Sequence, residues 1–298
     1  MQKIFQLESF MARNIVIPNP ERFKKIKKAI SKGGPKHLHI LSDFDRTLTK
    51  AFVDGKSVPS LISILREENY LTPDYSQKAK ELYAKYHPIE IDPNISLKEK
   101  KKAMREWWMA HFDLLIRSGL NKRDLKKVVE SDRIKLKEGC QEFLDFLQKH
   151  NIPLVIISSS GLGKEAIAMY LEKKGRLYKN IYIISNSYEW DEAGNAIAVK
   201  QPIIHGMNKD MTIIQNFPVF EIIKERKNVL LMGDNLADVE MVKGFHYDNL
   251  LKIGFLNEKV KENLEQYKNK YDFLILNDTS MEPVNSLLKE IITRKIFI

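Results

Sequence analysis

The sequence predicts an α/β fold: a doubly wound, mostly parallel sheet with an all-helical cap domain inserted into it. After Gly139, apolar runs of strand length alternate with helical patterns, which is typical of a parallel sheet covered by helices. Between about residues 57 and 130 the apolar spacing is helical throughout and strand signals are missing. We therefore expect residues 1–52 and 136–298 to form the core, and residues 53–135 to form the cap.

The first elements of the core come before the insertion. Residues 23–30 are Lys-rich with helical apolar spacing, and the cluster Gly33-Gly34-Pro35 ends this helix. We expect residues 1–36 to be a helical extension. Residues 37–41 form a short strand candidate that leads directly into Ser42-Asp43-Phe44-Asp45.

The elements after the insertion repeat the order of strand and helix. A turn-forming sequence at residues 191–195 predicts a hairpin. Strands are expected at 153–157, 181–185, 229–232, 250–255 and 273–276, and helices at 141–149, 163–174, 220–224, 238–243 and 282–292.

Composition narrows the class of protein. Of the 298 residues, 43% are hydrophobic and 30% are charged, as in ordinary globular domains. No apolar run approaches the roughly 20 residues of a membrane helix, and the first 17 residues lack a signal-peptide pattern. One cysteine, Cys140, excludes an internal disulfide framework. We expect a cytoplasmic protein with no membrane partner, as a monomer or weak dimer.

The formal charge of +10 attracts anions. The lysines are spread along the chain, and the densest run, at residues 98–102, is interrupted by Glu99. This pattern indicates a solvated helix face, and no zinc-finger or RNA-binding signature is present. We expect small anionic substrates and no nucleic-acid partner.

Four polar clusters follow strand candidates, the place where such sheets bind ligands. They are Asp43-Phe44-Asp45, the run Ser158-Ser159-Ser160-Gly161, Lys209 with Asp210, and Asp234 with Asp238. Each alone is more often a turn, a helix cap or a surface residue. Together, in this order and at these strand ends, they favour one site.

Several carboxylates at one point repel each other unless a cation lies among them, and Mg²⁺ prefers such oxygen ligands. Asp43 then attacks phosphorus as the nucleophile, and Asp45 serves as general acid and base. Ser158 and the small-residue turn after it donate to phosphate oxygens, and Lys209 supplies a fixed positive charge. The predicted chemistry is magnesium-dependent hydrolysis of a phosphate ester.

The four clusters resemble the motifs of the haloacid-dehalogenase (HAD) superfamily, and Asp45 marks its phosphatase branch. Further segments are similar to the cytosolic 5'-nucleotidase III (pyrimidine 5'-nucleotidase) family, from about residue 39 to 292. These segments are Ile89-Glu90-Ile91-Asp92-Pro93, Glu106-Trp107-Trp108, Leu136-Lys137-Glu138-Gly139, Asn208-Lys209 and residues 251–257.

The resemblance assigns further roles. It implies that Asp43, the backbone carbonyl of Asp45 and Asp234 hold magnesium, with Asp238 supporting them. It also places Ser159, with Ser158 and Lys209, at the phosphate. In the cap, it implies that Glu90 contacts the nucleobase and that Trp107 and Trp108 supply an aromatic wall, although a Trp pair at helical spacing is more often core.

Three positions depart from the family pattern. A third serine, Ser160, lengthens the second motif. His111 falls where the family has a serine that touches substrate. Arg46 replaces an apolar residue in the first motif, either as a cation near the phosphate or as a solvated side chain.

The resemblance implies hydrolysis of nucleoside 5'-monophosphates, with pyrimidines preferred. Two alternatives remain. One is a phosphatase of another small ester, such as 7-methyl-GMP, a sugar phosphate or phosphoserine. The other is a binding protein on a dead phosphatase fold, which the presence of Asp43, Asp45, Lys209 and Asp234 disfavours.

Overall fold

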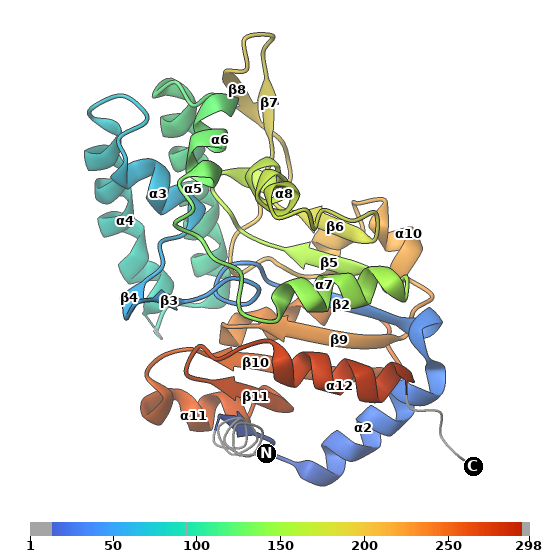
Figure 1. The fold of residues 1–298 in the computed structure, drawn as a ribbon. Coiled ribbons are helices and arrows are strands. Elements are labelled where there is room, and N and C mark those ends of the chain that lie inside the picture. Colours follow the sequence, from blue (N-terminus) through green and yellow to red (C-terminus); the bar gives the residue numbers. More distant parts are fainter. Residues whose placement is uncertain (1–13, 93, 294–298) are drawn as a thin grey trace.

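The computed structural model describes residues 14–92 and 94–293, and within them a seven-stranded sheet forms the centre of the core (Figure 1). The strands from β11 to β6 run parallel, and β1 pairs antiparallel with β11. Across the sheet the order is β1 (Ile15–Val16), β11 (Phe273–Leu276), β10 (Asn249–Leu256), β9 (Asn228–Gly233), β2 (Leu38–Ser42), β5 (Leu154–Ile157) and β6 (Ile181–Ile184). The predicted doubly wound sheet is confirmed.

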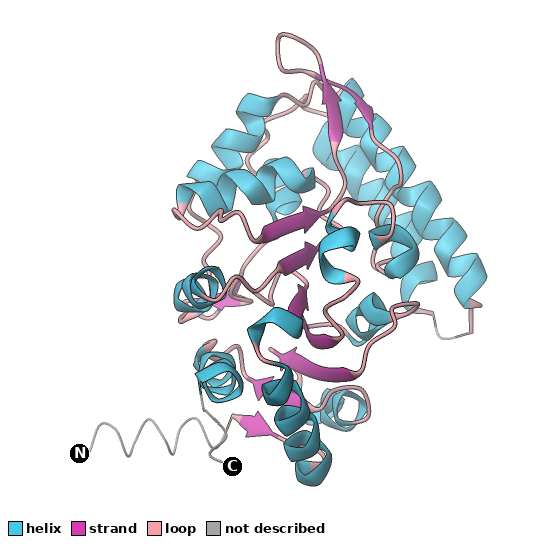
Figure 2. Cartoon of the chain, turned by 90° about the vertical axis from the view of Figure 1, so that its right-hand side faces the viewer, coloured by secondary structure: helices cyan, strands magenta, loops and turns pink. Residues whose placement is uncertain are grey.

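Helices cover both faces of this sheet (Figure 2). One face packs against α2 (Pro20–Gly33), α7 (Cys140–Lys149), α8 (Gly163–Lys173) and α12 (Glu282–Thr293). The other packs against α10 (Val219–Ile223), the 3₁₀ helix η2 (Leu236–Val242) and α11 (Val260–Lys268), with the short α9 (Met211–Ile214) nearby. A further short 3₁₀ helix, η1 (Pro35–His37), leads into β2.

Alternation along the strands explains the two apolar layers. In β9, Leu230 and Met232 join one cluster, whereas Val229 and Leu231 join the other. Successive side chains of a strand point to opposite faces, so a strand that is apolar throughout must be buried on both.

The inserted segment contains α3 (Leu61–Glu67), α4 (Tyr75–Ile91), α5 (Leu97–Arg117) and α6 (Lys122–Glu130). Capping boxes start two of these helices: Ser96 with Glu99 begins α5, and Asn121 with Asp124 begins α6. The expectation of an all-helical segment over residues 53–135 is wrong at its start. A small hairpin, β3 (Phe52–Val53) and β4 (Lys56–Ser57), lies there, and two-residue strands are too short to show a period.

The predicted hairpin at 191–195 is confirmed as the turn between β7 (Tyr188–Trp190) and β8 (Ala196–Val199). It lies against the inserted helices (Figure 1). The backbone N–H of Lys122 donates to the Gly194 carbonyl at 2.9 Å, and that of Ala196 donates to the Leu120 carbonyl at 2.8 Å.

The N-terminal region is only partly helical within the described residues. Helix α2 is present, but β1 adds an edge strand that the sequence did not predict, because two residues carry no periodicity. Residues 1–13 of the expected extension lie outside the described residues. Among the helices of the described chain, none is long and apolar enough to cross a membrane.

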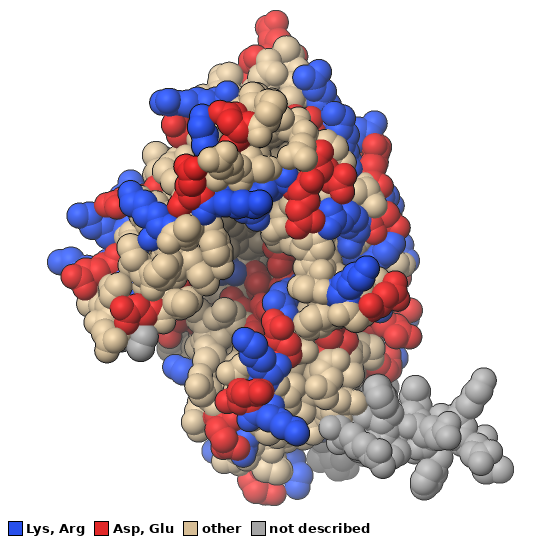
Figure 3. Space-filling view, turned by 90° about the vertical axis from the view of Figure 1, so that its left-hand side faces the viewer, with Lys and Arg blue, Asp and Glu red and all other residues tan. Residues whose placement is uncertain are grey.

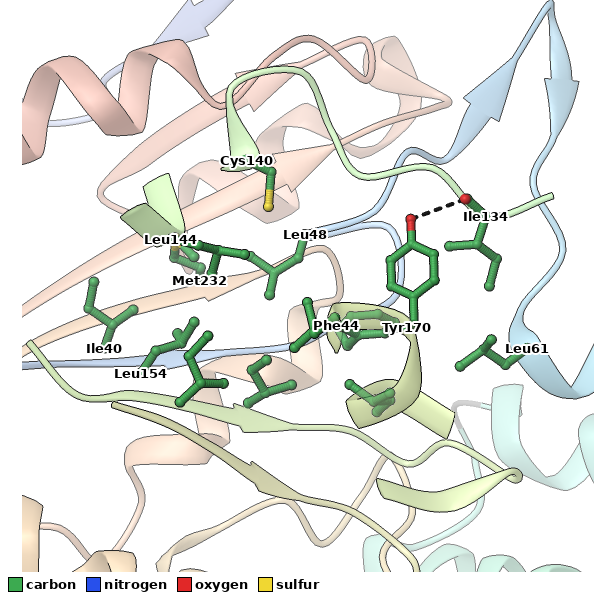
Figure 4. Close-up of a cluster of buried hydrophobic side chains, with 14 of the residues drawn as sticks. Ile40, Phe44, Leu48, Leu61, Ile134, Cys140, Leu144, Leu154, Tyr170 and Met232 are labelled. Carbon is green, nitrogen blue, oxygen red and sulfur yellow. Dashed lines mark hydrogen bonds between the residues drawn. The ribbon is translucent and has the colours of Figure 1, made fainter. Parts of the chain in front are cut away.

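Phe44 fixes the end of β2 to the core. Its ring lies fully buried, 6.0 Å from the ring of Tyr170 in an edge-to-face arrangement (Figure 4). Tyr170 in turn donates its hydroxyl to the Ile134 carbonyl at 3.1 Å. Because Phe44 points into this layer, its neighbours Asp43 and Asp45 are held at the opposite side of the chain.

Candidate active site

Asp43 and Lys209 form the centre of the site. Asp43 follows β2 directly, and its backbone N–H donates to the Met232 carbonyl of β9 at 3.0 Å. The Nζ of Lys209 lies 2.7 Å from Oδ1 of Asp43 and 3.4 Å from Oδ1 of Asp238. All three side chains are at least 90% buried. Residues 166 positions apart in the chain thus meet in one buried ion pair.

Three carboxylates gather beside this lysine. Asp43, Asp234 and Asp238 each offer an oxygen, and these oxygens lie within 4.8 Å of one another. The backbone of η2 brings Asp238 back toward β9, because Oδ2 of Asp238 accepts from the Asn235 N–H at 3.0 Å. Gly233 makes room for this return: a Cβ there would lie 2.4 Å from the Cβ of Asp238.

The electrostatics of this cluster fit a divalent cation. Burial, followed by the charges of Asp238 and Asp43, raises the pKa of Asp234 well above its usual value. Burial also raises the pKa of Asp238 to about 6, although Lys209 opposes the shift. Such carboxylates are destabilised by desolvation and by each other, and a bound Mg²⁺ relieves both. The donor set therefore suits magnesium.

Lys209 stays charged in this setting. Burial works against its charge, but the charges of Asp43 and Asp238 outweigh that cost, so its pKa rises above the ordinary lysine value. A permanently protonated lysine beside Asp43 is suited to a phosphate oxygen. The salt bridge from Lys101 of α5 to Asp210, at 3.7 Å, ties the next residue to the inserted helices.

Asp45 has a different environment from Asp43. Burial is the main cause that raises its pKa, with the negative charge of Asp43 second, and the pKa reaches about 7. A carboxylic acid with a pKa near neutrality can both give and take a proton at physiological pH. Asp45 also lines the adjoining pocket.

Hydrogen bonds fix the serine loop that follows β5, residues 158–161. Ser158 is buried and accepts the Ser160 N–H on its hydroxyl at 3.2 Å. Two groups that the sequence did not single out fix the rest of the loop: Asn186 Nδ2 donates to the Ser160 carbonyl at 3.3 Å, and the Tyr188 hydroxyl donates to the Gly161 carbonyl at 2.5 Å. No short motif marks either residue.

A pocket of about 260 Å³, which we call the leaving-group pocket, opens between this loop and the inserted helices. Figure 3 shows a hollow with charged side chains around it on this face of the molecule. Aromatic and polar side chains share the wall of the pocket. The lining residues are Asp45, Ser60, Ile62, Ser63, Arg66, Tyr83, Trp107, Trp108, His111, Ser159, Ser160 and Gly161.

Five of the residues predicted from sequence thus meet in the leaving-group pocket, namely Asp45, Trp107, Trp108, His111 and Ser159. Glu90 does not line it. This carboxylate lies 3.1 Å from Nδ1 of His87, near the end of α4. The two tryptophans stack at a centroid distance of 6.5 Å, and Trp107 also contacts Tyr83 edge-to-face.

His111 and Arg46 occupy contrasting positions. His111 Nε2 is hydrogen-bonded to the Tyr75 hydroxyl at 3.1 Å, and burial, with the charge of Arg66 second, lowers its pKa to about 4. It is therefore neutral at physiological pH. Arg46 donates to Glu258 at 2.5 Å, and its Nε lies 3.9 Å from Asp234, so it is placed at the edge of the carboxylate cluster and partly exposed.

The sequence did not single out Arg66, Tyr83, Ser60 or Ser63. The apolar positions of α3 indicated a helix, but periodicity shows only which residues face the core. Which polar side chains of the remaining face border a pocket depends on the neighbouring helices.

Residues 46–292 match the family described as pyrimidine 5'-nucleotidase (UMPH-1). The chain belongs to this family. A relative from Gallus gallus, a 7-methylguanosine phosphate-specific 5'-nucleotidase, is 34% identical over 277 residues, which cover 93% of this chain and 95% of the relative. The pyrimidine 5'-nucleotidase resemblance read from the motifs is thereby confirmed.

Solved structures agree with this membership. Cytosolic 5'-nucleotidase IIIB, in a crystal structure bound to cytidine, is similar with a TM-score of 0.84 and 28% identity over 93% of both chains. A phosphoserine phosphatase, studied as a phospho-aspartyl intermediate analogue, shares the fold with a TM-score of 0.50 and 19% identity, over 84% of this chain and 97% of that one. The HAD-type fold of this pyrimidine 5'-nucleotidase family member is confirmed.

Proposed function

We propose that this protein is a magnesium-dependent 5'-nucleotidase that hydrolyses nucleoside 5'-monophosphates through a phosphorylated Asp43. The observation that carries the proposal is the buried contact of Lys209 with Asp43 beside two further carboxylates, next to an aromatic pocket. Membership of the pyrimidine 5'-nucleotidase family supports the same reaction.

Each residue has a distinct part in the reaction. An oxygen of Asp43 forms a bond to phosphorus while the bond from phosphorus to the 5'-oxygen of the nucleoside breaks. Asp45 gives its proton to that leaving oxygen, and its pKa near 7 suits the transfer. Lys209 and the Ser158–Ser159 loop bind the phosphoryl oxygens and stabilise their negative charge.

The second half of the reaction, hydrolysis of the phosphorylated Asp43, returns the enzyme to its starting state. Asp45, now deprotonated, takes a proton from a water molecule that attacks phosphorus, and the bond from phosphorus to Asp43 breaks to release phosphate. Asp43, Asp234 and the backbone carbonyl of Asp45 would hold Mg²⁺, with Asp238 beside them. When bound, the metal neutralises charge that develops on the phosphoryl group.

We further propose that the protein works in the cytoplasm. We also propose that residues 53–135 act as a cap over the leaving group. Helices α3, α4 and α5 supply the outer wall of the leaving-group pocket, whereas Asp45 and the serine loop come from the core. A base stacked on Trp107 or Trp108 would place its ribose toward Asp45. Pyrimidine nucleotides are the primary candidates.

A second candidate substrate is 7-methyl-GMP. The relative from Gallus gallus is named for this nucleotide, and a positively charged base is attracted by the faces of aromatic rings such as those of Tyr83 and Trp107. Both candidates share the chemistry at Asp43 and differ only in the leaving group.

The test is phosphate release from CMP, UMP, dCMP, GMP, AMP, 7-methyl-GMP, phosphoserine and sugar phosphates, with magnesium and with a chelator. We expect magnesium-dependent turnover of nucleotides and none after chelation. Turnover of non-nucleotide esters alone would retain the chemistry but refute the nucleotidase assignment. Absence of turnover on every ester would leave a binding function as the alternative.

Asp43→Asn tests the nucleophile. It should abolish turnover while circular dichroism shows an unchanged fold, because an amide cannot form the aspartyl phosphate. Turnover at the wild-type rate would refute the assignment of Asp43 as the nucleophile.

A further inference from the structure

One cation of the leaving-group pocket has no place in the chemistry proposed above. Arg66, on α3, lines the pocket together with Ser60, Ser63 and His111. Its Nη2 donates to the Ser63 hydroxyl at 3.2 Å. A guanidinium carries five N–H donors in a rigid fork, so most of them remain for another acceptor.

Arg66 lacks the carboxylate partner that its sequence neighbourhood offers. Glu67 and Glu68 follow it directly, but both pair with Arg133, at 2.5 and 3.0 Å. Within the part of the chain that the structure describes, no Asp or Glu oxygen lies within 4 Å of the Arg66 guanidinium. The positive charge of Arg66 is therefore not cancelled by a salt bridge.

The other side chains at this end of the pocket do not cancel it either. Ser60 and Ser63 hydroxyls are hydrogen-bonded to each other at 2.9 Å. His111 is neutral, because burial, with the charge of Arg66 second, lowers its pKa. Among the residues that line the pocket, Asp45 is the only carboxylate, and it comes from the core rather than from α3.

Resting on the proposed nucleotidase function, we infer that Arg66 is a specificity-determining residue. It selects nucleotides whose base presents oxygen acceptors without positive charge, and it disfavours a cationic base. Among the candidates, UMP is the preferred substrate and 7-methyl-GMP is rejected.

The chemistry of the bases gives the expected order of substrate preference. Uracil presents two carbonyl oxygens, one on each side of its ring N–H, and either oxygen offers the guanidinium an acceptor. Cytosine has one carbonyl and an amino donor, which repels an N–H donor on one edge. The methylated guanine ring carries a positive charge, which the guanidinium repels in a partly desolvated pocket where charges are poorly screened. Stacking on tryptophan does not remove that repulsion.

The experiment compares kcat/KM for UMP, CMP and 7-methyl-GMP at mildly acidic pH, where the methylated ring is cationic, in the wild type and in Arg66→Met. Methionine keeps the length of the side chain and removes its charge. We expect the wild type to favour UMP over 7-methyl-GMP by at least about tenfold, and Arg66→Met to shift that ratio toward 7-methyl-GMP by about tenfold, or ~1.4 kcal/mol.

Two variants control the interpretation. Arg66→Lys keeps the charge and loses the fork, so it should still reject 7-methyl-GMP while its KM for UMP rises. Arg123→Met removes an exposed arginine of α6 that does not line the pocket, and it should leave the ratio unchanged. A ratio that Arg66→Met changes by less than about twofold, or a wild type that prefers 7-methyl-GMP, overturns the inference.

Turnover of an aryl phosphate separates this inference from the proposed function. If the wild type hydrolyses p-nitrophenyl phosphate with magnesium, the Asp43 chemistry stands whatever the nucleotide ratio shows. Inhibition of that reaction by uridine and by 7-methylguanosine then measures base selection without a 5'-phosphate. Equal inhibition constants for the two nucleosides in the wild type would refute the inference that Arg66 selects the base. Absence of all turnover would refute the proposed function itself.

Discussion

Acid pH should destabilise this protein through His39, which lies on the strand that carries Asp43. His39 is fully buried in β2, with its ring 5.2 Å from that of Phe245. Nδ1 donates to the Arg226 carbonyl at 2.8 Å, whereas Nε2 is buried and has no hydrogen-bond partner. Protonation would place a second N–H there, without an acceptor.

The pKa of His39 gives the size and sign of the effect. Burial is the main cause that lowers it from the ordinary 6.5 to about 4. Because the unfolded chain binds the proton more readily, stability is fully present above pH 6.5 and is lost as the pH falls toward 4. At 1.36 kcal/mol for each tenfold change in the binding constant, the loss is about 2 kcal/mol at pH 5 and approaches 3 kcal/mol at lower pH.

The assay is urea unfolding of the wild type and of His39→Asn at pH 8 and pH 5. Asparagine can keep the donor to Arg226 and does not titrate, so its free energy of unfolding should fall by about 2 kcal/mol less between these pH values. His37→Asn, two residues away and exposed, is the matched control and should behave like the wild type. Parallel stability curves for wild type and His39→Asn would refute the reasoning.

Three further predictions concern the site and its support. Lys209→Met should lower turnover of nucleotides and of an aryl phosphate alike by about 10²–10³-fold, because it removes charge stabilisation from the phosphoryl group; a smaller loss would remove Lys209 from the phosphate site. Phe44→Ala should cost about 3–5 kcal/mol in urea unfolding, since the ring is fully buried against Tyr170, and a cost below about 1 kcal/mol would contradict the packing. Glu90→Ala should reduce kcat/KM for nucleotides far more than for the aryl phosphate if the cap brings Glu90 to the base; equal losses would place Glu90 outside the base site.

Local pattern was enough for most strands and helices of the core, although α11 (Val260–Lys268) was not predicted. The strand predicted at residues 273–276 and the helix predicted at 282–292 agree almost to the residue with β11 and α12, because Asp272, Asn277 and Asp278 flank the strand and the apolar spacing of both elements is clear. Beyond element type, the motifs indicated that Asp43, Lys209 and Asp234 would meet. That followed from a rule about parallel sheets, whose strands all end at one edge.

Two kinds of structural feature could not be predicted from the sequence: very short strands and contacts between segments that are distant in the chain. Strand β1 and the hairpin β3–β4 are two residues per strand, which no period can reveal. The support of the serine loop by Asn186 and Tyr188 depends on a hairpin that also contacts the inserted helices. Such contacts are made between segments that are distant in the chain and have no local signature.

The sequence by itself determined the fold class, the family and the charged groups that gather beside Asp43. The reason is that buried strands, their carboxyl ends and the motif residues can all be recognised from short local segments. The tertiary structure decided which side chains line the pocket beside Asp45. It brought Arg66 into the pocket with Trp107 and left Glu90 beside His87, outside the lining. The reason is physical: a helix pattern shows which face is apolar, but the partner of its polar face depends on how neighbouring helices pack.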